Sequence, residues 1–483
     1  MERLSGLDAS FLYLETPTMQ MQVAFVAICD TRNTPGGYSF PKLVERIESR
    51  VNREPAFRRR LVEVPLNLNH PLWIEDPDFN IFNHIRQYTL GDPGTLADLG
   101  HMLGQIMTKP LDRRFPLWEA WVVEGLENDR FALVIKVHHA AVDGVSGTAL
   151  ISHLFDEDVN VHELKWAPPA QVEKMPSEAE LVFHALRSKV KTTSRLLKLL
   201  KETYRGVRSY AGRHTGERQS EASMPLTAPR THFNNRIGKH RDVAFAHLSL
   251  NEIKAVKRAS GVTVNDVVLA LCGGVLRRYL LNHNDLPEKS LISMVPISVR
   301  QGSQMKDVNN QVSGMWASIG THLEDHLERL KVIHQDTELA KKDIDAIGAT
   351  ILRDWAEFNT PGAFNLAVRL YSSLGLVERM APVHNTIISN VPGPQHALYL
   401  AGNKIEAMYP LGPVMEGVGV NISLASYQDC VGFAIHVDKD QVKDVGEIAD
   451  LFEPVFAEFK QALGIVAPDS RDVPAQVRAK GGA

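Results

Sequence analysis

The clearest chemical signal in the chain is a short segment in which His138 and His139 precede Asp143 and Gly144. The pKa of an imidazole lies near neutrality, so either histidine could take a proton from a hydroxyl group and later return it. Asp143 could hold the surrounding loop by pairing with a cation, and Gly144 allows close packing or an unusual backbone angle. The segment therefore predicts general-base chemistry.

The residues around these histidines predict the elements that must position them. Residues 131–138 form a short run rich in apolar and β-branched side chains, which favours a buried strand. Side chains alternate along a strand, so His139 shares a face with Val137 while His138 points to the other side. Residues 144–154 favour a helix. The histidines are therefore expected at a strand-to-helix turn, where only one of them can face a given cavity.

Two other interpretations of this segment carry less weight. Two histidines can simply end a buried strand, but four specified residues at fixed offsets rarely coincide. His139 and Asp143 could bind a metal, yet no third ligand stands at a recognisable spacing. The cysteines Cys29, Cys272 and Cys430 are far apart and form neither a zinc nor a disulfide pattern. Neither kind of site is expected.

Length and composition limit the class of protein. A chain of 483 residues is too long for one ordinary core and predicts two domains. The apolar fraction of 44% and the charged fraction of 23% are typical of globular proteins, and the net charge of −4 does not suggest a nucleic-acid binder. The N-terminus lacks the pattern of a signal peptide, and no apolar run is long enough to span a bilayer. We expect a cytoplasmic protein whose membrane contact is at most peripheral.

Changes of composition divide the chain into four stretches. They are an N-terminal domain over residues 1–165, a basic helical linker over 166–241, a C-terminal domain over 242–466 and a disordered tail over 467–483. Within the linker, Ser177 and Glu180 form a capping-box pattern that predicts the start of a long helix.

The linker helix is strongly basic. From Arg187 to Arg218 the chain has ten basic residues and two acidic ones. Apolar residues recur at roughly helical spacing, and the basic side chains gather on another side. Such a helix could lie on an anionic membrane or lipid-droplet surface. It could equally be a packed connector whose basic face is solvated.

The C-terminal domain predicts a series of regular elements. A strand is expected over residues 243–248, and Ser249 should cap a short helix that Gly261 ends. The other expected elements are an amphipathic helix over 264–281, a strand over 291–295 closed by Pro296, and a hairpin of strands 418–424 and 431–437.

Several motifs, in order along the chain, resemble one enzyme family. The pattern His-His-x-x-x-Asp-Gly is shared by CoA-dependent acyltransferases of the chloramphenicol acetyltransferase-like class and by nonribosomal peptide condensation domains. The ordered set resembles the bacterial wax ester synthase/acyl-CoA:diacylglycerol acyltransferase family, over about residues 4–465. The matching segments are residues 4–12, 116–121, 262–268, 295–300 and 389–394.

This resemblance implies a fold, a reaction and roles for residues. The fold would be α/β (α+β), with two chloramphenicol acetyltransferase-like domains, a tunnel between them and a partly helical linker. His139 would be the general base, and Arg300 would pair with Asp143 to hold the loop. The substrates would be a long-chain acyl-CoA and either a diacylglycerol or a fatty alcohol. No cofactor, metal or nucleic acid would be needed.

Asn265 and Asp266 match the family's second motif, and two explanations remain open there. Thr263 and Asp266 also form a capping-box pattern, so we expect Asp266 to be structural. Asn265 could pack at the start of the helix or donate a hydrogen bond to a developing oxyanion. At Gln22 many family members have histidine, and no role is assigned to Gln22.

Two rival functions differ from O-acylation in what they require. An amide-forming condensation domain would need carrier-protein partners, and the chain contains no carrier or adenylation segment. A non-catalytic lipid-droplet coating protein would not need His139, so the intact motif weighs against it. The sequence therefore favours direct transfer of an acyl group to a hydroxyl group, without a covalent enzyme intermediate.

Overall fold

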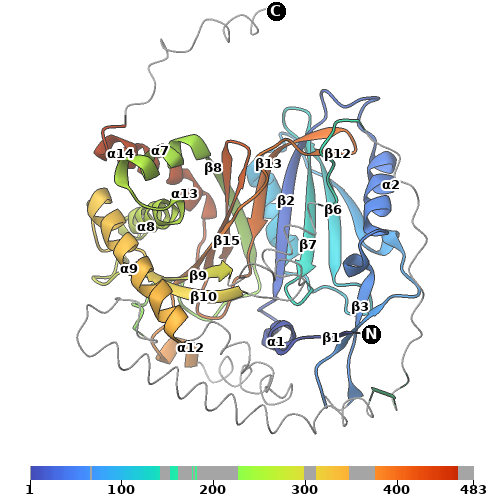
Figure 1. The fold of residues 1–483 in the computed structure, drawn as a ribbon, viewed down its shortest axis with the longest axis horizontal. Helices are drawn as coiled ribbons and strands as arrows, with labels where there is room; N and C mark the ends of the chain where they lie inside the picture. Colours follow the sequence, from blue (N-terminus) through green and yellow to red (C-terminus); the bar gives the residue numbers. More distant parts are fainter. Residues whose placement is uncertain are drawn as a thin grey trace, which may run out of the picture.

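Two six-stranded sheets stand side by side in this computed structural model, and helices cover their outer faces (Figure 1). The structure describes residues 2–65, 68–141, 153–160, 177, 180–181, 227–298, 312–347 and 376–465. The expected mixed α/β architecture is confirmed. A small three-stranded sheet at the N-terminal end contains β1 (Glu2–Arg3), β4 (Leu72–Glu75) and β3 (Arg59–Val62).

The first large sheet contains the strand that leads to the histidine pair. Its order is β12 (Tyr399–Leu400), β13 (Asn403–Leu411), β2 (Gln22–Asp30), β7 (Arg130–His138), β6 (Trp118–Leu126) and β5 (Ile85–Thr89). The predicted strand over 131–138 is confirmed as β7, which is buried after its first residue. Asn128 and Asp129, both at positive φ, make the tight turn between β6 and β7.

Helices cover both faces of this sheet. On one face, Phe25 and Ile135 join a core cluster with Leu43 of α2 (Phe40–Val51). On the other face, Val134 joins a cluster with Leu103 of α3 (Leu96–Met107). The alternation predicted for β7 is therefore seen in its two opposite cores. Helix α1 (Gly6–Leu14) lies at the end of the sheet near the N-terminus (Figure 1).

Close packing of α3 on β8 (Arg241–Ser249) joins the two halves of the molecule. A Cβ atom at Gly100 would lie 2.0 Å from the carbonyl oxygen of Val243, and one at Gly104 would lie 2.2 Å from that of Arg241. Any side chain at these two positions would push the helix away from the strand. The two glycines therefore allow a helix of the first half to pack directly on the second sheet.

The second sheet mixes parallel and antiparallel pairs. Its order is β10 (Val312–Ser318), β9 (Ile292–Ser298), β11 (Thr386–Val391), β14 (Val420–Tyr427), β15 (Cys430–Asp438) and β8. Strand β11 pairs in parallel with β9 and β14. The predicted hairpin is confirmed, because β14 and β15 are antiparallel with Tyr427 opposite Cys430.

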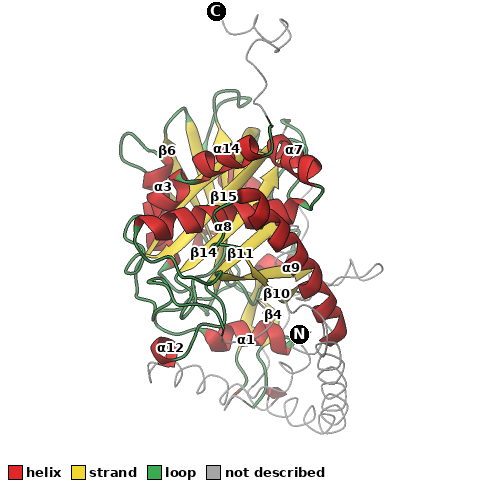
Figure 2. Cartoon of the chain, turned by 90° about the vertical axis from the view of Figure 1, so that its left-hand side faces the viewer, coloured by secondary structure: helices red, strands yellow, loops and turns green. Residues whose placement is uncertain are grey.

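Helices cover the outer face of the second sheet, as Figure 2 shows for α7, α8, α9 and α14. They are α7 (Leu250–Ser260), α8 (Val264–Asn282), α9 (His326–Ile347), α13 (Val445–Asp450) and α14 (Phe452–Ala462), with a short α12 (Leu376–Arg379) below. The predicted caps of α7 are confirmed, with Ser249 at the N-cap and Gly261 in the left-handed conformation at the C-cap.

Two expectations about this half were wrong. Helix α8 is not amphipathic, because every residue from Asp266 to Leu276 is buried between the sheet and the neighbouring helices. Pro296 does not close its strand, because β9 continues to Ser298. Proline has no N–H to donate to a neighbouring strand. It is tolerated at position 296 because the pairing of β9 with β11 has already stopped at Met294.

The C-terminal part of the chain contributes to both sheets. After β11, residues 399–411 cross to the first sheet, where β13 pairs with β2. The chain then returns through residues 412–419 to β14 of the second sheet. Within the described residues no single helix could cross a membrane; α7 and α8 together pass that test by length and composition, but they are bent by 103° at their junction.

Candidate active site

A cavity of about 260 Å³ lies between the two sheets, and His139 lines it. The first sheet contributes Met21, Val23, Phe25, Val137 and His139 to its wall. The second sheet contributes side chains of β9, β11 and β14, and the end of β13 with the following residues Gly412, Pro413 and Met415 completes the lining. Four lining residues have polar side chains: His139, Ser389, Asn421 and Ser423. The cavity is therefore mainly apolar, which suits an acyl chain.

His139 is fixed at the point where β7 ends. Its backbone N–H donates to the carbonyl oxygen of Met21 at 2.8 Å, which extends the ladder between β2 and β7 by one residue. Its ring stacks on Phe11 of α1, with centroids 4.0 Å apart and an interplanar angle of 22°. The side chain is half-buried and stands on the same face as Val137. The imidazole is thus held at the edge of the apolar cavity.

His138 lies on the opposite face, as the alternation predicted, and both of its ring nitrogens are engaged. The backbone N–H of Ala140 donates to Nδ1 at 3.0 Å, so Nδ1 carries no proton. Nε2 must then carry it, and this atom lies 3.2 Å from Oε1 of Glu15. The side chain is 2% exposed and does not line the cavity. His138 therefore braces the turn that carries His139.

Glu15 connects this brace to two other segments. Its Oε1 accepts from the backbone N–H of Met21 at 3.1 Å, and its Oε2 accepts from Arg113 at 2.9 Å. Burial raises the pKa of Glu15, but hydrogen bonds and charge from His138 and Arg113 outweigh burial, and the pKa lies below its ordinary value. Glu15 is thus held ionised, and sequence reasoning missed it because its partners are distant in the chain.

The three polar side chains of the opposite wall come from neighbouring strands. Ser389 of β11 lies directly opposite Ser423 of β14 in the parallel ladder, and Asn421 is two residues before Ser423 on the same face. Nothing in the sequence around these residues assigns them a role. Only the packing of the two sheets brings this face opposite His139.

Asp266 uses its carboxylate to anchor helices rather than to line the cavity. Its Oδ2 accepts from Thr263 Oγ1 and from His334 Nδ1, both at 2.8 Å, and its Oδ1 accepts from Thr337 at 2.8 Å. Burial raises the pKa of Asp266, but these hydrogen bonds outweigh it and lower the pKa. Asn265 lies half-buried in the first turn of α8 and is not among the lining residues.

Trp118, in the segment 116–121, has structural contacts. Its ring stacks on His84 at 4.4 Å and meets Phe57 edge-on at 5.3 Å. Its Nε1–H donates to the carbonyl oxygen of Phe57 at 2.7 Å. These contacts fix the start of β6 beside β7, so Trp118 has an architectural role.

Several sequence-predicted residues lie outside the described part of the chain. They are Asp143, Gly144 and Arg300, together with residues 144–152 of the expected helix and the basic stretch from Arg187 to Arg218. The capping box of the linker is present, since Ser177 and Glu180 exchange hydrogen bonds at 2.8 and 3.3 Å. Within the described residues, no group of three or more histidine, cysteine or acidic side chains could hold a metal ion.

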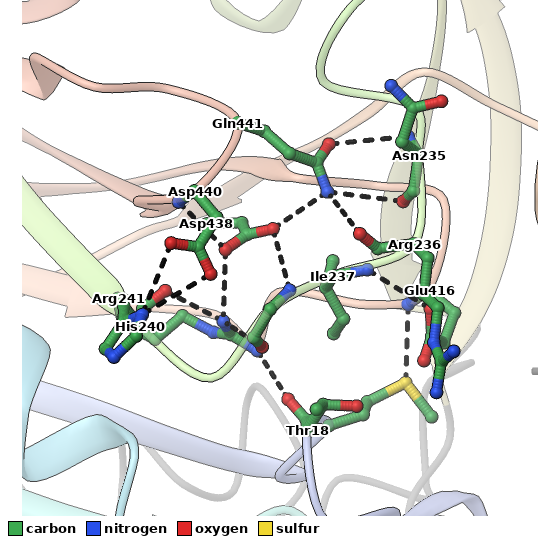
Figure 3. Close-up of polar contacts among 12 residues, drawn as sticks. Thr18, Asn235, Arg236, Ile237, His240, Arg241, Glu416, Asp438, Asp440 and Gln441 are labelled. Atoms are coloured by element: carbon green, nitrogen blue, oxygen red, sulfur yellow. Dashed lines mark hydrogen bonds and ion pairs between the residues drawn. The ribbon is translucent and has the colours of Figure 1, made fainter.

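A polar cluster joins the segment before β2, the residues around Arg241 and the end of β15 (Figure 3). Arg241 donates to the carbonyl oxygen of Thr18 at 2.5 Å and lies 3.5 Å from Asp438. Asp438 also accepts from the backbone N–H of Gly238 at 3.0 Å and from Gln441 at 2.8 Å. The cluster ties the residues before β2, which include the cavity-lining Met21, to the end of β15.

Comparisons with known proteins agree with this architecture. The family described as the wax ester synthase/diacylglycerol acyltransferase catalytic domain matches residues 4–268, and the C-terminal domain of the same family matches residues 308–460. A Mycobacterium tuberculosis protein that bears the name diacylglycerol O-acyltransferase is 37% identical over 460 residues, covering 95% of this chain and 90% of that protein.

Solved structures extend the likeness to three dimensions. The wax ester synthase/diacylglycerol acyltransferase from Marinobacter aquaeolei VT8 has a TM-score of 0.67 and 28% identity, covering 96% of this chain and 100% of that chain. The first condensation domain of the CDA synthetase has a TM-score of 0.55 at 13% identity, covering 96% and 95%, and is similar in fold alone. The chain belongs to the wax ester synthase/diacylglycerol acyltransferase family of enzymes.

Proposed function

We propose that this enzyme transfers a long-chain acyl group from acyl-CoA to the hydroxyl group of a diacylglycerol or a long-chain alcohol, with His139 as general base. The observation that carries this proposal is the contrast between the two histidines. His139 faces an apolar cavity between the sheets, whereas both nitrogens of His138 are engaged with Ala140 and Glu15. The Marinobacter structure, named a wax ester synthase/diacylglycerol acyltransferase, supports both acceptor classes.

The reaction needs no covalent enzyme intermediate. His139 takes the proton of the acceptor hydroxyl as the hydroxyl oxygen attacks the carbonyl carbon of the thioester. A carbon–oxygen bond forms, and the carbonyl oxygen becomes an oxyanion. The carbon–sulfur bond then breaks, and the imidazolium returns its proton to the departing CoA thiolate. The products are an ester and free CoA, and the histidine is neutral again.

The cavity supports this order of events. Apolar side chains from both sheets surround the histidine, so the acyl chain and the acceptor chain can replace water there. Exclusion of water strengthens each polar interaction inside the cavity and protects the thioester from hydrolysis. Stacking on Phe11 keeps the imidazole plane fixed while the reactants approach.

The test uses purified full-length protein and labelled palmitoyl-CoA. Hexadecanol, dioleoylglycerol and hexadecylamine are offered separately, and the lipid products are separated by chromatography. We expect wax ester, triacylglycerol or both, and little amide. Amide as the main product would favour a condensation-type reaction instead. Release of CoA without any lipid ester would contradict acyl transfer to a hydroxyl group.

We further propose that Asp143 and Arg300 form the ion pair that holds the loop after His139. The match of both residues to family motifs supports this proposal. Removal of one partner of a buried pair costs about 3–5 kcal/mol, so Asp143→Asn and Arg300→Ala should each lower stability and activity together. The two changes should be non-additive in a double-mutant cycle, and additive losses would contradict the pairing.

We propose that the enzyme works on the cytoplasmic side, at the surface of a membrane or a lipid droplet. Its acceptors are poorly soluble, so they must be taken from such a surface. The ten basic residues between Arg187 and Arg218 support attraction to anionic lipids.

A further inference from the structure

The wall of the cavity that faces His139 is one face of the second sheet. Along β11, Ile387, Ser389 and Val391 line the cavity, whereas Ile388 packs into the core under the helices. The same alternation holds along β14, where Asn421, Ser423 and Ala425 line the cavity. This regular alternation means that the side chain of Ser389 points into the space that His139 borders.

Two of the three polar side chains on this wall, Ser423 and Asn421, already form hydrogen bonds with the backbone segment between the sheets. The hydroxyl of Ser423 donates to Oδ1 of Asn421 at 2.8 Å, and its oxygen accepts from the N–H of Gly412 at 3.1 Å. Asn421 donates to the carbonyl oxygen of Pro413 at 2.9 Å. These bonds hold residues 412–413, which themselves line the cavity. Ser423 and Asn421 therefore shape the cavity.

Ser389 differs from its two neighbours. Among the described residues, its hydroxyl has no hydrogen-bond partner, and the side chain is half-buried at the cavity surface. A hydroxyl group can rotate to donate its proton toward a ligand. Ser389 is thus the polar group of this wall that can donate to a substrate without breaking a bond already present.

We propose that Ser389 is a catalytic residue whose hydroxyl donates a hydrogen bond to the thioester carbonyl oxygen as that oxygen becomes an oxyanion. The proposal rests on the acyl transfer proposed above. His139 removes the proton of the acceptor from one side, and the negative charge gathers on the carbonyl oxygen at the other. Ser389 keeps its own proton throughout, so the balance of the reaction is unchanged.

The apolar surroundings make such a donor important. An oxyanion in a dry, apolar cavity has no water to stabilise it, so one fixed donor has a large effect on the rate. The hydrogen bond strengthens as charge develops, so it lowers the barrier more than it tightens ground-state binding. Asn265, the sequence-based candidate for this role, lies on α8 and is not among the lining residues.

The decisive experiment compares Ser389→Ala with the wild type in steady-state transfer from palmitoyl-CoA to hexadecanol. We expect kcat to fall about 10²–10³-fold, the range for loss of one oxyanion donor, with KM changed less than threefold. Ser389→Thr keeps a hydroxyl and should recover at least a tenth of the wild-type kcat. Affinity for S-hexadecyl-CoA, a thioether without the carbonyl oxygen, should not change.

Two control variants separate this role from general damage. Ser318→Ala removes a buried hydroxyl of the same sheet that does not line the cavity, and it should leave kcat unchanged. Asn265→Ala should also retain most of its kcat. Circular dichroism and thermal melting must show that all variants are folded. A larger kcat loss in Asn265→Ala than in Ser389→Ala would assign the donor to Asn265 and overturn the proposal.

Failure of this inference is distinguishable from failure of the proposed function. If the wild type makes wax ester and His139→Ala does not, but Ser389→Ala is as fast as the wild type, only the role of Ser389 is wrong. An equal loss of affinity for palmitoyl-CoA and for its thioether would show a packing role and would also overturn the proposal. A wild type that forms no ester would overturn both.

Discussion

Nε2 of His138 lies 3.2 Å from Oε1 of Glu15, on the side of β7 that faces away from the cavity. The next residue, His139, faces the cavity. Adjacent side chains of a strand point to opposite faces, so these two histidines lie on opposite sides of β7 although they are neighbours in the chain. One is fixed by a carboxylate and a backbone N–H, and the other borders the space where substrates fit.

The first prediction compares His139→Ala with His138→Ala. Loss of a general base typically lowers the rate about 10²–10⁴-fold, so His139→Ala should nearly abolish ester formation with little loss of stability. His138→Ala should lower the melting temperature more, because it leaves the Glu15 carboxylate without one partner, and should keep more activity per folded molecule. Initial rates and thermal melting of both variants check this. Greater loss of activity in an equally folded His138→Ala would reverse the assignment.

The second prediction concerns Glu15 and pH. Its pKa in the folded protein is lowered, so its contribution to stability is fully present above the ordinary carboxyl pKa of about 4.3 and is lost as pH falls through the folded value. Relative to the wild type, Glu15→Gln should therefore be less stable at pH 7, by about 1.5–3 kcal/mol for hydrogen bonds to a charged group.

Denaturant unfolding of the wild type and Glu15→Gln between pH 3.5 and 7 measures this difference directly. The gap between the two proteins should narrow steadily below about pH 4.3. A gap that stays constant across this range would mean that the ionised carboxylate does not stabilise the fold.

The third prediction concerns Asp266, which anchors α8 to α9 through His334 and Thr337. Asp266→Asn should lower the free energy of unfolding by at least about 0.5–2 kcal/mol, the range typical of a lost helix cap. It should leave kcat per folded molecule nearly unchanged. His334→Ala should be coupled to it in a double-mutant cycle. A large fall in kcat at unchanged melting temperature would instead indicate a direct role in catalysis.

Features that depend on local sequence could be predicted well. Ser249 and Gly261 mark the two ends of α7, and Tyr427 and Cys430 close the β14–β15 hairpin, because caps and tight turns need particular residues within a few positions. The opposite orientation of the two histidines follows from strand periodicity alone. These inferences needed no knowledge of distant contacts.

Features that depend on long-range packing could not be predicted. Nothing local in β13 indicates that it joins the first sheet beside β2, because strand pairing at that distance is decided by the whole topology. Ser389 lies in the family-matching segment 389–394 without an assigned role, and only the packing of the two sheets shows that it lines the cavity beside His139. Pro296 was expected to end β9, because the sequence does not reveal that pairing with β11 already stops at Met294.

The fourth prediction concerns Lys136, whose side chain is fully buried two residues before His138. Its Nζ donates to the carbonyl oxygens of Ile106 at 3.1 Å and Lys109 at 2.6 Å, near the end of α3. Burial lowers its pKa to about 8. In the unfolded chain a lysine has a pKa of about 10.4. Between about pH 8 and pH 10.4 this lysine therefore binds more protons in the unfolded chain than in the folded protein, so its contribution to the stability of the fold should rise with pH over that range.

Lys136→Met provides the reference for this effect, since other groups also titrate at alkaline pH. The difference in free energy of unfolding between the wild type and Lys136→Met should be constant below about pH 7. The wild type should then gain stability relative to the variant between about pH 8 and pH 10. Urea unfolding at matched ionic strength measures it. A difference that is flat or decreasing over that range would mean that Lys136 has an ordinary or raised pKa in the folded protein.

The fifth prediction concerns the basic stretch of the linker, which lies outside the described residues. Replacement of Arg187, Lys191, Arg195 and Lys198 by Gln should weaken binding to anionic vesicles, because each basic residue near such a surface contributes about 1 kcal/mol. Salt screens this attraction, so the effect should be largest at low ionic strength.

Turnover of a short-chain alcohol in detergent-free buffer should change little, because His139 is remote in sequence from the substituted residues. Vesicle sedimentation at two salt concentrations and the soluble-substrate assay separate the two interpretations of the stretch. If activity on both kinds of substrate falls together with stability while vesicle binding is unchanged, the helix is a packed connector between the two halves of the molecule.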